Sequence, residues 1–142
     1  MYKCGEIYNV DFGKNKDSVQ SGIRPAIIVS NNIGNANSPN VIVIPLTSKI
    51  KKENMPTHVV IEPSKENGLK YKSMALCENL TTISKKQLNI KIGNVHKDNM
   101  AKISCAMYIA TTSLSYIEAQ SMNEFINYLL SFCNKSSTSM CK

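Results

Sequence analysis

The sequence predicts an α+β fold, in which a small twisted β-barrel has a helix packed against it. Before Val95, short segments rich in β-branched residues alternate with segments rich in Gly, Asn, Ser and Pro, as strands and turns do. After Val95, apolar residues recur at every third or fourth position, which is the spacing of an amphipathic helix. Short strands followed by helices are typical of this class.

The predicted strands differ in how they are buried. In residues 5–12 apolar and polar residues alternate, as expected of a strand with one buried face. Residues 25–30 and 40–46 are continuous apolar runs, the pattern of strands that are buried on both faces. Turn-forming residues fill the segment between these two runs. The predicted strands are 5–12, 25–30, 40–46, 57–62, 73–79 and 89–93.

Two helices and one helical turn are predicted after and between the strands. Ser84 and Gln87 form a capping box, which predicts one short helical turn. The apolar stripe of residues 97–114 predicts an amphipathic helix. A second capping box, Ser121 with Glu124, predicts another amphipathic helix, followed by a frayed polar tail.

The net charge of +7 is confined to the predicted barrel and first helix, residues 1–114. These residues hold 15 basic and 8 acidic side chains, whereas the predicted C-terminal helical extension, residues 115–142, holds two of each. Such an excess suits a polyanionic partner, nucleic acid first, or an acidic protein that competes for the same face. A solvated lysine-rich surface explains the charge equally well.

Cysteine usage and hydropathy predict a cytoplasmic protein. The five cysteines are odd in number and scattered, with no Cys-x-x-Cys pair, which predicts free thiols and no zinc site. The longest apolar run, residues 41–46, has the length of a strand, so no membrane span is predicted. The N-terminus lacks the apolar core of a signal peptide.

Arg24 is the only arginine among the 17 basic residues. Pro25 favours an extended backbone at position 24, so the arginine lies where a loop enters a buried strand. A guanidinium differs from an ammonium in its planar donor fork, which binds two oxygens of a phosphate at once. A chain that otherwise uses lysine therefore indicates a phosphate contact at Arg24. A surface salt bridge is the structural alternative.

A second candidate follows the strand predicted at 40–46, where Pro45 indicates an edge or a bulge. Thr47 and Ser48 place hydroxyl groups at the strand end, beside a lysine cluster that begins with Lys49. A hydroxyl near cations can hold a phosphate oxygen or a ribose hydroxyl. Taken alone, an ordinary polar strand end explains these residues better.

The two histidines offer a rival chemistry, because RNA cleavage by internal attack of the 2′-hydroxyl needs a base and an acid. His58 lies in a predicted strand and His96 near a helix N-terminus, and nothing in the sequence brings them together. Sheet packing and helix capping are the structural alternatives. Four aromatic residues could stack on bases, although core packing is their usual fate; they are Tyr2, Tyr8, Phe12 and Tyr71.

Taken together and in this order, the segments resemble the MazF/PemK family of toxins from toxin–antitoxin modules, which are small sequence-selective endoribonucleases. The matching stretches include GEIYNVDF, SVQSGIRPAIIVSNNIGN, SPNVIVIPLTSKIKK, GLKYKSMALCENLTTISKKQL and KIGNVHKDNMAKI, over about residues 5–114. The resemblance implies a twisted SH3-like barrel with a C-terminal helix, assembled as a homodimer. Residues 115–142 exceed the common family length, and we expect the extra helix to pack on the dimer rather than to dock the antitoxin or cover the first helix.

The resemblance also implies the reaction. The chain would cleave single-stranded RNA at short sequence motifs without a metal ion or other cofactor, leaving a 2′,3′-cyclic phosphate and a 5′-hydroxyl. Arg24 and Thr47 fall on the family's catalytic pair. We expect Arg24 to clamp the scissile phosphate and stabilise its growing negative charge, because a guanidinium hardly deprotonates in proteins. Thr47 would hold the same phosphate or the leaving oxygen, and an acidic cognate antitoxin would occupy the same RNA groove.

The family's RNA-binding positions can be carried over in the same way. The residues implied are Ser18, Gln20, Ser48, Lys49, Glu78, Asn79 and Thr81. Ser18 and Gln20 match a loop over the RNA groove, and Glu78 with Asn79 could read exposed base edges. The chain departs from the family pattern at Val19, Ser21 and Thr81, where glutamate, glycine and arginine are usual. The missing arginine at Thr81 removes one phosphate or base contact, and we expect this to alter substrate sequence and affinity rather than catalysis.

Two other functions fit the same segments. A non-catalytic module that binds single-stranded RNA would keep the basic face without depending on Arg24 and Thr47. A gyrase poison of the related toxin fold ranks last, because that class typically uses a C-terminal tryptophan motif and this chain has no tryptophan.

Overall fold

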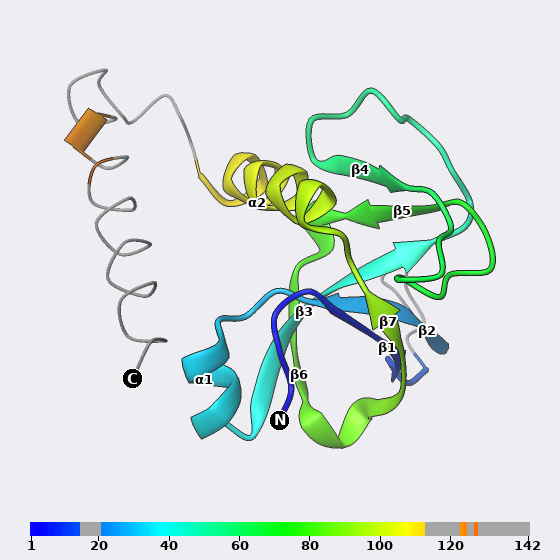
Figure 1. Cartoon of the computed structure of the whole chain (residues 1–142), viewed down its shortest axis with the longest axis vertical. Helices are drawn as coiled ribbons and strands as arrows, with labels where there is room; N and C mark the ends of the chain where they lie inside the picture. The colour runs from blue at the N-terminus through cyan, green and yellow to red at the C-terminus, as the bar shows by residue number, and fades with distance from the viewer. Residues whose placement is uncertain (15–20, 113–122, 125–126, 128–142) are drawn as a thin grey trace. The chain divides into compact units, whose positions relative to one another are not determined.

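The computed structural model describes residues 1–14, 21–112, 123–124 and 127. The chain divides into two units, Met1–Thr111 and Thr112–Lys142, and every element described below belongs to the first. This unit is a mixed α+β structure with one large antiparallel sheet and a C-terminal helix (Figure 1), which confirms the predicted α+β class.

The strands of the first unit form one sheet, which pairs β4-β5-β3-β2-β1-β7 in that order, with β6 paired to β3 outside this path. No pairing joins the edge strands β4 and β7 within the described residues, so the sheet does not close. The SH3-like barrel therefore remains a prediction. In chain order, with η for a 3-10 helix, the elements are β1 (Glu6–Asp11), β2 (Ile23–Ile28), α1 (Asn32–Asn37), β3 (Asn40–Thr47), β4 (His58–Ile61), β5 (Ser73–Leu76), η1 (Cys77–Asn79), β6 (Thr81–Ser84), η2 (Lys85–Gln87), β7 (Leu88–Asn94) and α2 (Lys97–Thr111).

Strand β3 joins the β4–β5 pair to the strands β2, β1 and β7. It pairs with β2 along one side, and on its other side first with β6, through residues 40–43, and then with β5, through Leu46 and Thr47. Pro45 does not mark a sheet edge, contrary to the sequence-based expectation: it is buried and lies opposite Ala26 in β2. The proline is tolerated because it falls between the segments paired to β6 and to β5, where its missing N–H interrupts neither ladder.

Apolar residues fill both faces of the central strands, as their continuous apolar runs predict. Neighbouring residues of β2 and β3 point into different cores, Ile27 and Ile44 into the first and Ile28 and Val43 into the second. Both cores contain a residue of β1; the first also contains residues of β4, β5 and α2, and the second contains residues of β6 and β7. The two cores fix the sheet from both sides and so position the strand ends that form the site.

Helix α2 matches the amphipathic helix predicted over residues 97–114. Its Ile103 and Ala106 are buried in the first core, and Met100 and Met107 pack against that core. The helix lies beside β4 (Figure 1). The second predicted helix lies almost wholly outside the described residues, as does the predicted boundary at residue 114. Among the described residues, the structure has no helix with the length and apolar character needed to cross a membrane.

The sequence does not predict α1 or β6. Helix α1 forms in the segment expected to contain only turns, because the Asn31 side chain caps it by accepting a hydrogen bond from the Gly34 N–H at 2.8 Å. Asn35 is buried there, with its side-chain amide donating to the Ser30 carbonyl at 2.9 Å. The predicted turn after Ser84 is confirmed as η2, with both hydrogen bonds of the capping box in place.

Candidate active site

The ends of three neighbouring strands, β2, β3 and β5, meet and carry the residues that the sequence singles out. Strand β2 begins beside the point where β3 ends, because the two strands are antiparallel. Ala26 lies opposite Pro45, and Arg24 and Thr47 lie two residues beyond this pair, where both line one groove. Strand β5 begins at the same place, with its Met74 opposite Thr47. Sheet topology thus brings together two residues that are distant in the sequence.

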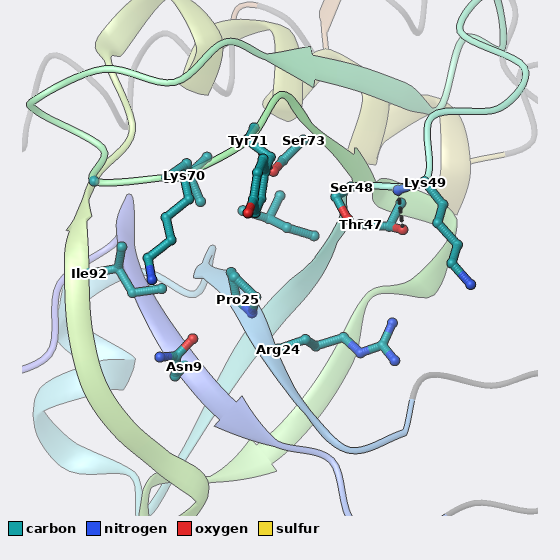
Figure 2. Close-up of a pocket in the computed structure, with 13 residues that line it drawn as sticks. Asn9, Arg24, Pro25, Thr47, Ser48, Lys49, Lys70, Tyr71, Ser73 and Ile92 are labelled. Carbon is teal, nitrogen blue, oxygen red and sulfur yellow. Dashed lines mark hydrogen bonds between the residues drawn. The ribbon is translucent and has the colours of Figure 1, made fainter.

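These strand ends border a groove of about 590 Å³. Its walls come from β1, β2, β3, β7 and the segment that leads into β5 (Figure 2). Within the described part of the chain, the lining holds three cations and no carboxylate, so the groove favours an anionic ligand. The lining residues are Asn9, Arg24, Pro25, Leu46, Thr47, Ser48, Lys49, Gly68, Leu69, Lys70, Tyr71, Ser73 and Ile92.

Arg24 is half-buried where the β1–β2 connection enters β2. Its guanidinium donates to the Ser21 carbonyl oxygen, from Nε at 3.2 Å and from Nη2 at 2.6 Å, which fixes the plane of the group. The connection is closed by Gly13 and Gly22, which both have positive φ and are joined by a 2.7 Å hydrogen bond from the Gly22 N–H to the Gly13 carbonyl. A phosphate oxygen carries more charge than a carbonyl oxygen and is the stronger acceptor for this guanidinium.

Thr47 ends β3 with its hydroxyl in a local turn. Thr47 Oγ1 accepts a hydrogen bond from the backbone N–H of Lys49 at 3.1 Å. The hydroxyl hydrogen takes no part in that contact and can point to a ligand oxygen. Ser48 and Lys49 are exposed beside it, and the Lys49 side chain extends to the same side of the groove as Arg24 (Figure 2). This end of the groove therefore combines a hydroxyl, a guanidinium and an ammonium group.

The segment before β5 forms the facing wall, of which the sequence analysis singles out only Tyr71. Gly68 has a φ of +64°, and a Cβ there would lie 2.4 Å from the backbone oxygen of Ile92. Only glycine allows this close approach, which holds the segment against β7. Lys70 and Tyr71 follow and point toward the floor of the groove (Figure 2).

Tyr71 is the aromatic residue of the groove, and 71% of it is exposed. The other three aromatic residues considered for base stacking pack against the second core. The sequence offers no signal for the two polar groups nearby, Lys70 and Asn9, because only the fold brings β1 and the segment before β5 together.

The structure separates the predicted site residues into three groups. The groove is lined by Arg24, Thr47, Ser48 and Lys49. Ser18 and Gln20 lie outside the described residues. Glu78 and Asn79 lie in η1 and Thr81 begins β6, and none of the three lines the groove. Thr81 lies opposite Val43, which is four residues before Thr47 and therefore about 13 Å away along β3.

Glu78 contacts His58, a residue considered above for catalysis. His58 Nε2 lies 2.8 Å from Glu78 Oε1, and His58 Nδ1 lies 2.9 Å from the Lys52 carbonyl oxygen. Burial raises the pKa of Glu78, but hydrogen bonds to its carboxylate outweigh that effect, so the pKa lies below its ordinary value. The carboxylate and the carbonyl are both hydrogen-bond acceptors, so the imidazole ring of His58 lies between two acceptors.

His96 has a separate partner at the start of α2. Its Nδ1 lies 3.5 Å from Asp98 Oδ2, and the side chain is half exposed. Neither His96 nor His58 lines the groove. The geometry thus favours the Arg24–Thr47 site over a histidine pair.

Comparison with known proteins identifies the family of the chain. Residues 3–110 match the family described as PemK-like, MazF-like toxin of type II toxin–antitoxin system. The chain belongs to this toxin family. Endoribonuclease EndoA from Bacillus subtilis (strain 168) is 35% identical to the toxin over 116 residues, which cover 82% of the toxin and 99% of EndoA.

Solved structures share the fold of this toxin. An endoribonuclease from Mycobacterial species, in complex with its cognate antitoxin, matches with a TM-score of 0.67 and 28% identity over 83% of the toxin and 99% of that chain. MazF from Deinococcus radiodurans matches with a TM-score of 0.65 over 76% of the toxin and 94% of that chain; at 17% identity, this likeness concerns the fold alone. The resemblance to the MazF/PemK family is therefore confirmed.

Proposed function

We propose that this toxin is an endoribonuclease that cleaves single-stranded RNA at short sequence motifs, without a metal ion, to a 2′,3′-cyclic phosphate and a 5′-hydroxyl. The observation that carries the proposal is the shared groove of Arg24 and Thr47, with Lys49 beside them and no carboxylate among the lining residues described. EndoA, the relative from Bacillus subtilis, is named an endoribonuclease, which supports the same reaction class.

The groove suits the charge changes of this reaction. The 2′-hydroxyl loses its proton and its oxygen attacks the adjacent phosphorus, while the bond to the 5′-oxygen breaks and that oxygen takes up a proton. Negative charge on the phosphoryl oxygens grows in the transition state. Arg24 binds these oxygens more strongly as their charge grows, which lowers the barrier. The Thr47 hydroxyl donates to a phosphoryl oxygen or to the leaving 5′-oxygen. Arg24 does not serve as the base, because guanidinium stays protonated in proteins.

The test is to incubate the purified protein with a long single-stranded RNA in EDTA and to map the new 5′ ends. We expect cuts at one recurring short motif with 5′-hydroxyl ends, and loss of cleavage in Arg24→Ala and in Thr47→Ala. Lys72→Ala is the matched control, because Lys72 lies outside the groove, 3.7 Å from Glu53 and 3.6 Å from Glu62. RNA binding without cleavage by the wild type would instead support the non-catalytic RNA-binding module.

An acidic segment of a cognate antitoxin is the proposed inhibitor, acting in the cytoplasm by occupying the same groove. The cations of the groove suit such a segment, and the Mycobacterial endoribonuclease above was solved with its cognate antitoxin. We expect the antitoxin to compete with a labelled RNA for the toxin. Arg24→Ala and Lys49→Ala should each weaken the binding of both ligands. Simultaneous binding of both would contradict a shared groove. We also propose a homodimer, which sedimentation equilibrium tests directly.

A further inference from the structure

The exposed ring of Tyr71 needs an explanation that the proposed cleavage does not supply. An aromatic side chain that is 71% exposed gains little from burial, unlike Tyr2, Tyr8 and Phe12, which pack against the second core. Its place in the groove is set by the protein, since the Ser73 hydroxyl donates to the Tyr71 carbonyl at 2.9 Å. This contact positions the Tyr71 backbone at the groove, and the exposed side chain stays accessible to a ligand.

The neighbours of Tyr71 in the sequence point in different directions. Lys72 lies 3.7 Å from Glu53 and 3.6 Å from Glu62, and it does not line the groove. Lys70 lines the groove and extends past Ile92 toward the floor (Figure 2). One ring and one ammonium group thus face the groove from the same wall.

The floor beneath them is formed by Asn9 and Pro25, which lie directly opposite each other in the β1–β2 pair. In Figure 2, Tyr71 lies above Pro25, whereas Lys70 and Asn9 lie at the end of the groove away from the Arg24 guanidinium. The Tyr71 side chain extends toward Pro25 with its hydroxyl end, and the two residues line the same space (Figure 2). The Asn9 amide adds a donor and an acceptor at its edge.

We propose that Tyr71, Lys70, Asn9 and Pro25 form a nucleotide subsite beside the cleavage site. An unpaired base stacks on the Tyr71 ring above Pro25, its edge meets the Asn9 amide, and its phosphate binds the Lys70 ammonium. This inference rests on the proposed function in one respect, the placement of the scissile phosphate at Arg24 and Thr47. The stacked base then belongs to a nucleotide that flanks this phosphate. Single strands are bound in this general manner, by aromatic stacking within a cationic groove.

The first test uses the absence of tryptophan from the sequence. Tyr71→Trp introduces a single indole at the subsite, and stacking on a base should quench its fluorescence saturably. The probes are 2′-O-methyl oligonucleotides of one base each, which lack the attacking hydroxyl, and an abasic oligomer of the same length and charge. Ile33→Trp is the control, because Ile33 lies on α1, outside the groove, and is 79% exposed. Quenching by the base-containing oligomers alone, at Tyr71→Trp alone, is the expected result.

The second test measures affinity for the same oligonucleotides by anisotropy. Tyr71→Ala should weaken binding about 5- to 150-fold, the range for loss of one stacked base, whereas Tyr71→Phe should bind like the wild type. Lys70→Ala should reduce the slope of log affinity against log salt by about 0.7, the value for one lost phosphate contact. Lys72→Ala should leave both quantities unchanged. Thermal unfolding of each variant shows whether a loss reflects misfolding.

The outcomes separate this inference from the proposed nuclease. If the wild type cleaves RNA but Tyr71→Ala binds as tightly, the stacking subsite is refuted and the nuclease stands. If the wild type does not cleave but Tyr71→Trp is quenched by bases alone, the subsite stands without the nuclease. Equal quenching by the abasic oligomer would overturn the inference, as would quenching by an acidic peptide of the antitoxin type but by no oligonucleotide. The latter result would assign the ring to a protein ligand.

Discussion

Replacing Arg24 by lysine separates the charge of the proposed phosphate clamp from its geometry. Near a protein surface, a unit charge about 4 Å from an opposite charge interacts by about 4 kcal/mol at an effective dielectric constant near 20. Arg24 is half-buried, so solvent screens part of this interaction, and we take about 3 kcal/mol. Arg24→Ala should therefore slow single-turnover cleavage by about 10²- to 10³-fold, similar to the loss of one oxyanion donor.

Arg24→Lys keeps the charge but loses the second bond of the fork. A hydrogen bond to a charged group contributes about 1.5–3 kcal/mol, so this variant should be about 10- to 100-fold slower than the wild type. The assay is single-turnover cleavage of a fluorogenic RNA that carries the mapped motif. Lys72→Ala serves as the charge control, and thermal unfolding verifies that each variant folds. An Arg24→Lys rate within twofold of the wild type would refute the need for a planar fork at this site.

Three further predictions concern other parts of the account. Thr47→Val removes the hydroxyl at nearly constant volume and should slow cleavage about 10²-fold, whereas Thr47→Ser should stay within about tenfold of the wild type; equal rates would show that the hydroxyl plays no part. The lowered pKa of Glu78 means that its contact with His58 stabilises the fold at neutral pH and that this contribution is lost as the pH falls through that pKa. The wild type should therefore exceed Glu78→Gln in free energy of unfolding at pH 6 and lose that advantage as the pH falls through the lowered pKa of Glu78. A difference that stays constant with pH would contradict an ionised contact. Gly93→Ala would place a Cβ 2.4 Å from the Glu66 backbone oxygen. It should lower the free energy of unfolding, measured in urea, by about 1–3 kcal/mol. An unchanged urea midpoint would show that the backbone at Glu66 can move away without cost.

Most of the strand pattern could be predicted because it depends on local periodicity. The continuous apolar runs at β2 and β3 predict burial on both faces, and the capping box at Ser84 predicts η2. Helix α1 could not be predicted in this way, since its stability depends on a cap by Asn31 and on the burial of Asn35. The interpretation of Pro45 as a sheet edge was wrong for a related reason, because the change of partner along β3 is a property of the whole sheet.

The candidate site could be predicted only in part. The isolated Arg24 and the hydroxyls after β3 are visible in the sequence, and the sheet register explains why they meet. The contribution of Lys70 and Asn9 depends on the close approach of the segment before β5 to β7 at Gly68, which no local pattern predicts. The contact between Glu78 and His58 is likewise invisible in the sequence, because 20 positions separate the two residues.

The most direct test of the central claim uses an oligonucleotide that carries the mapped motif with a single ribose, at the cleavage position, in an otherwise 2′-deoxy chain. The rate and the ends of the product are measured in EDTA for the wild type, Arg24→Ala and Lys72→Ala. The account predicts one cut, after that ribose, giving a 2′,3′-cyclic phosphate, with normal cleavage by Lys72→Ala and a loss of at least about 10²-fold in Arg24→Ala. Undiminished cleavage by Arg24→Ala would contradict the account and place the active site outside this groove.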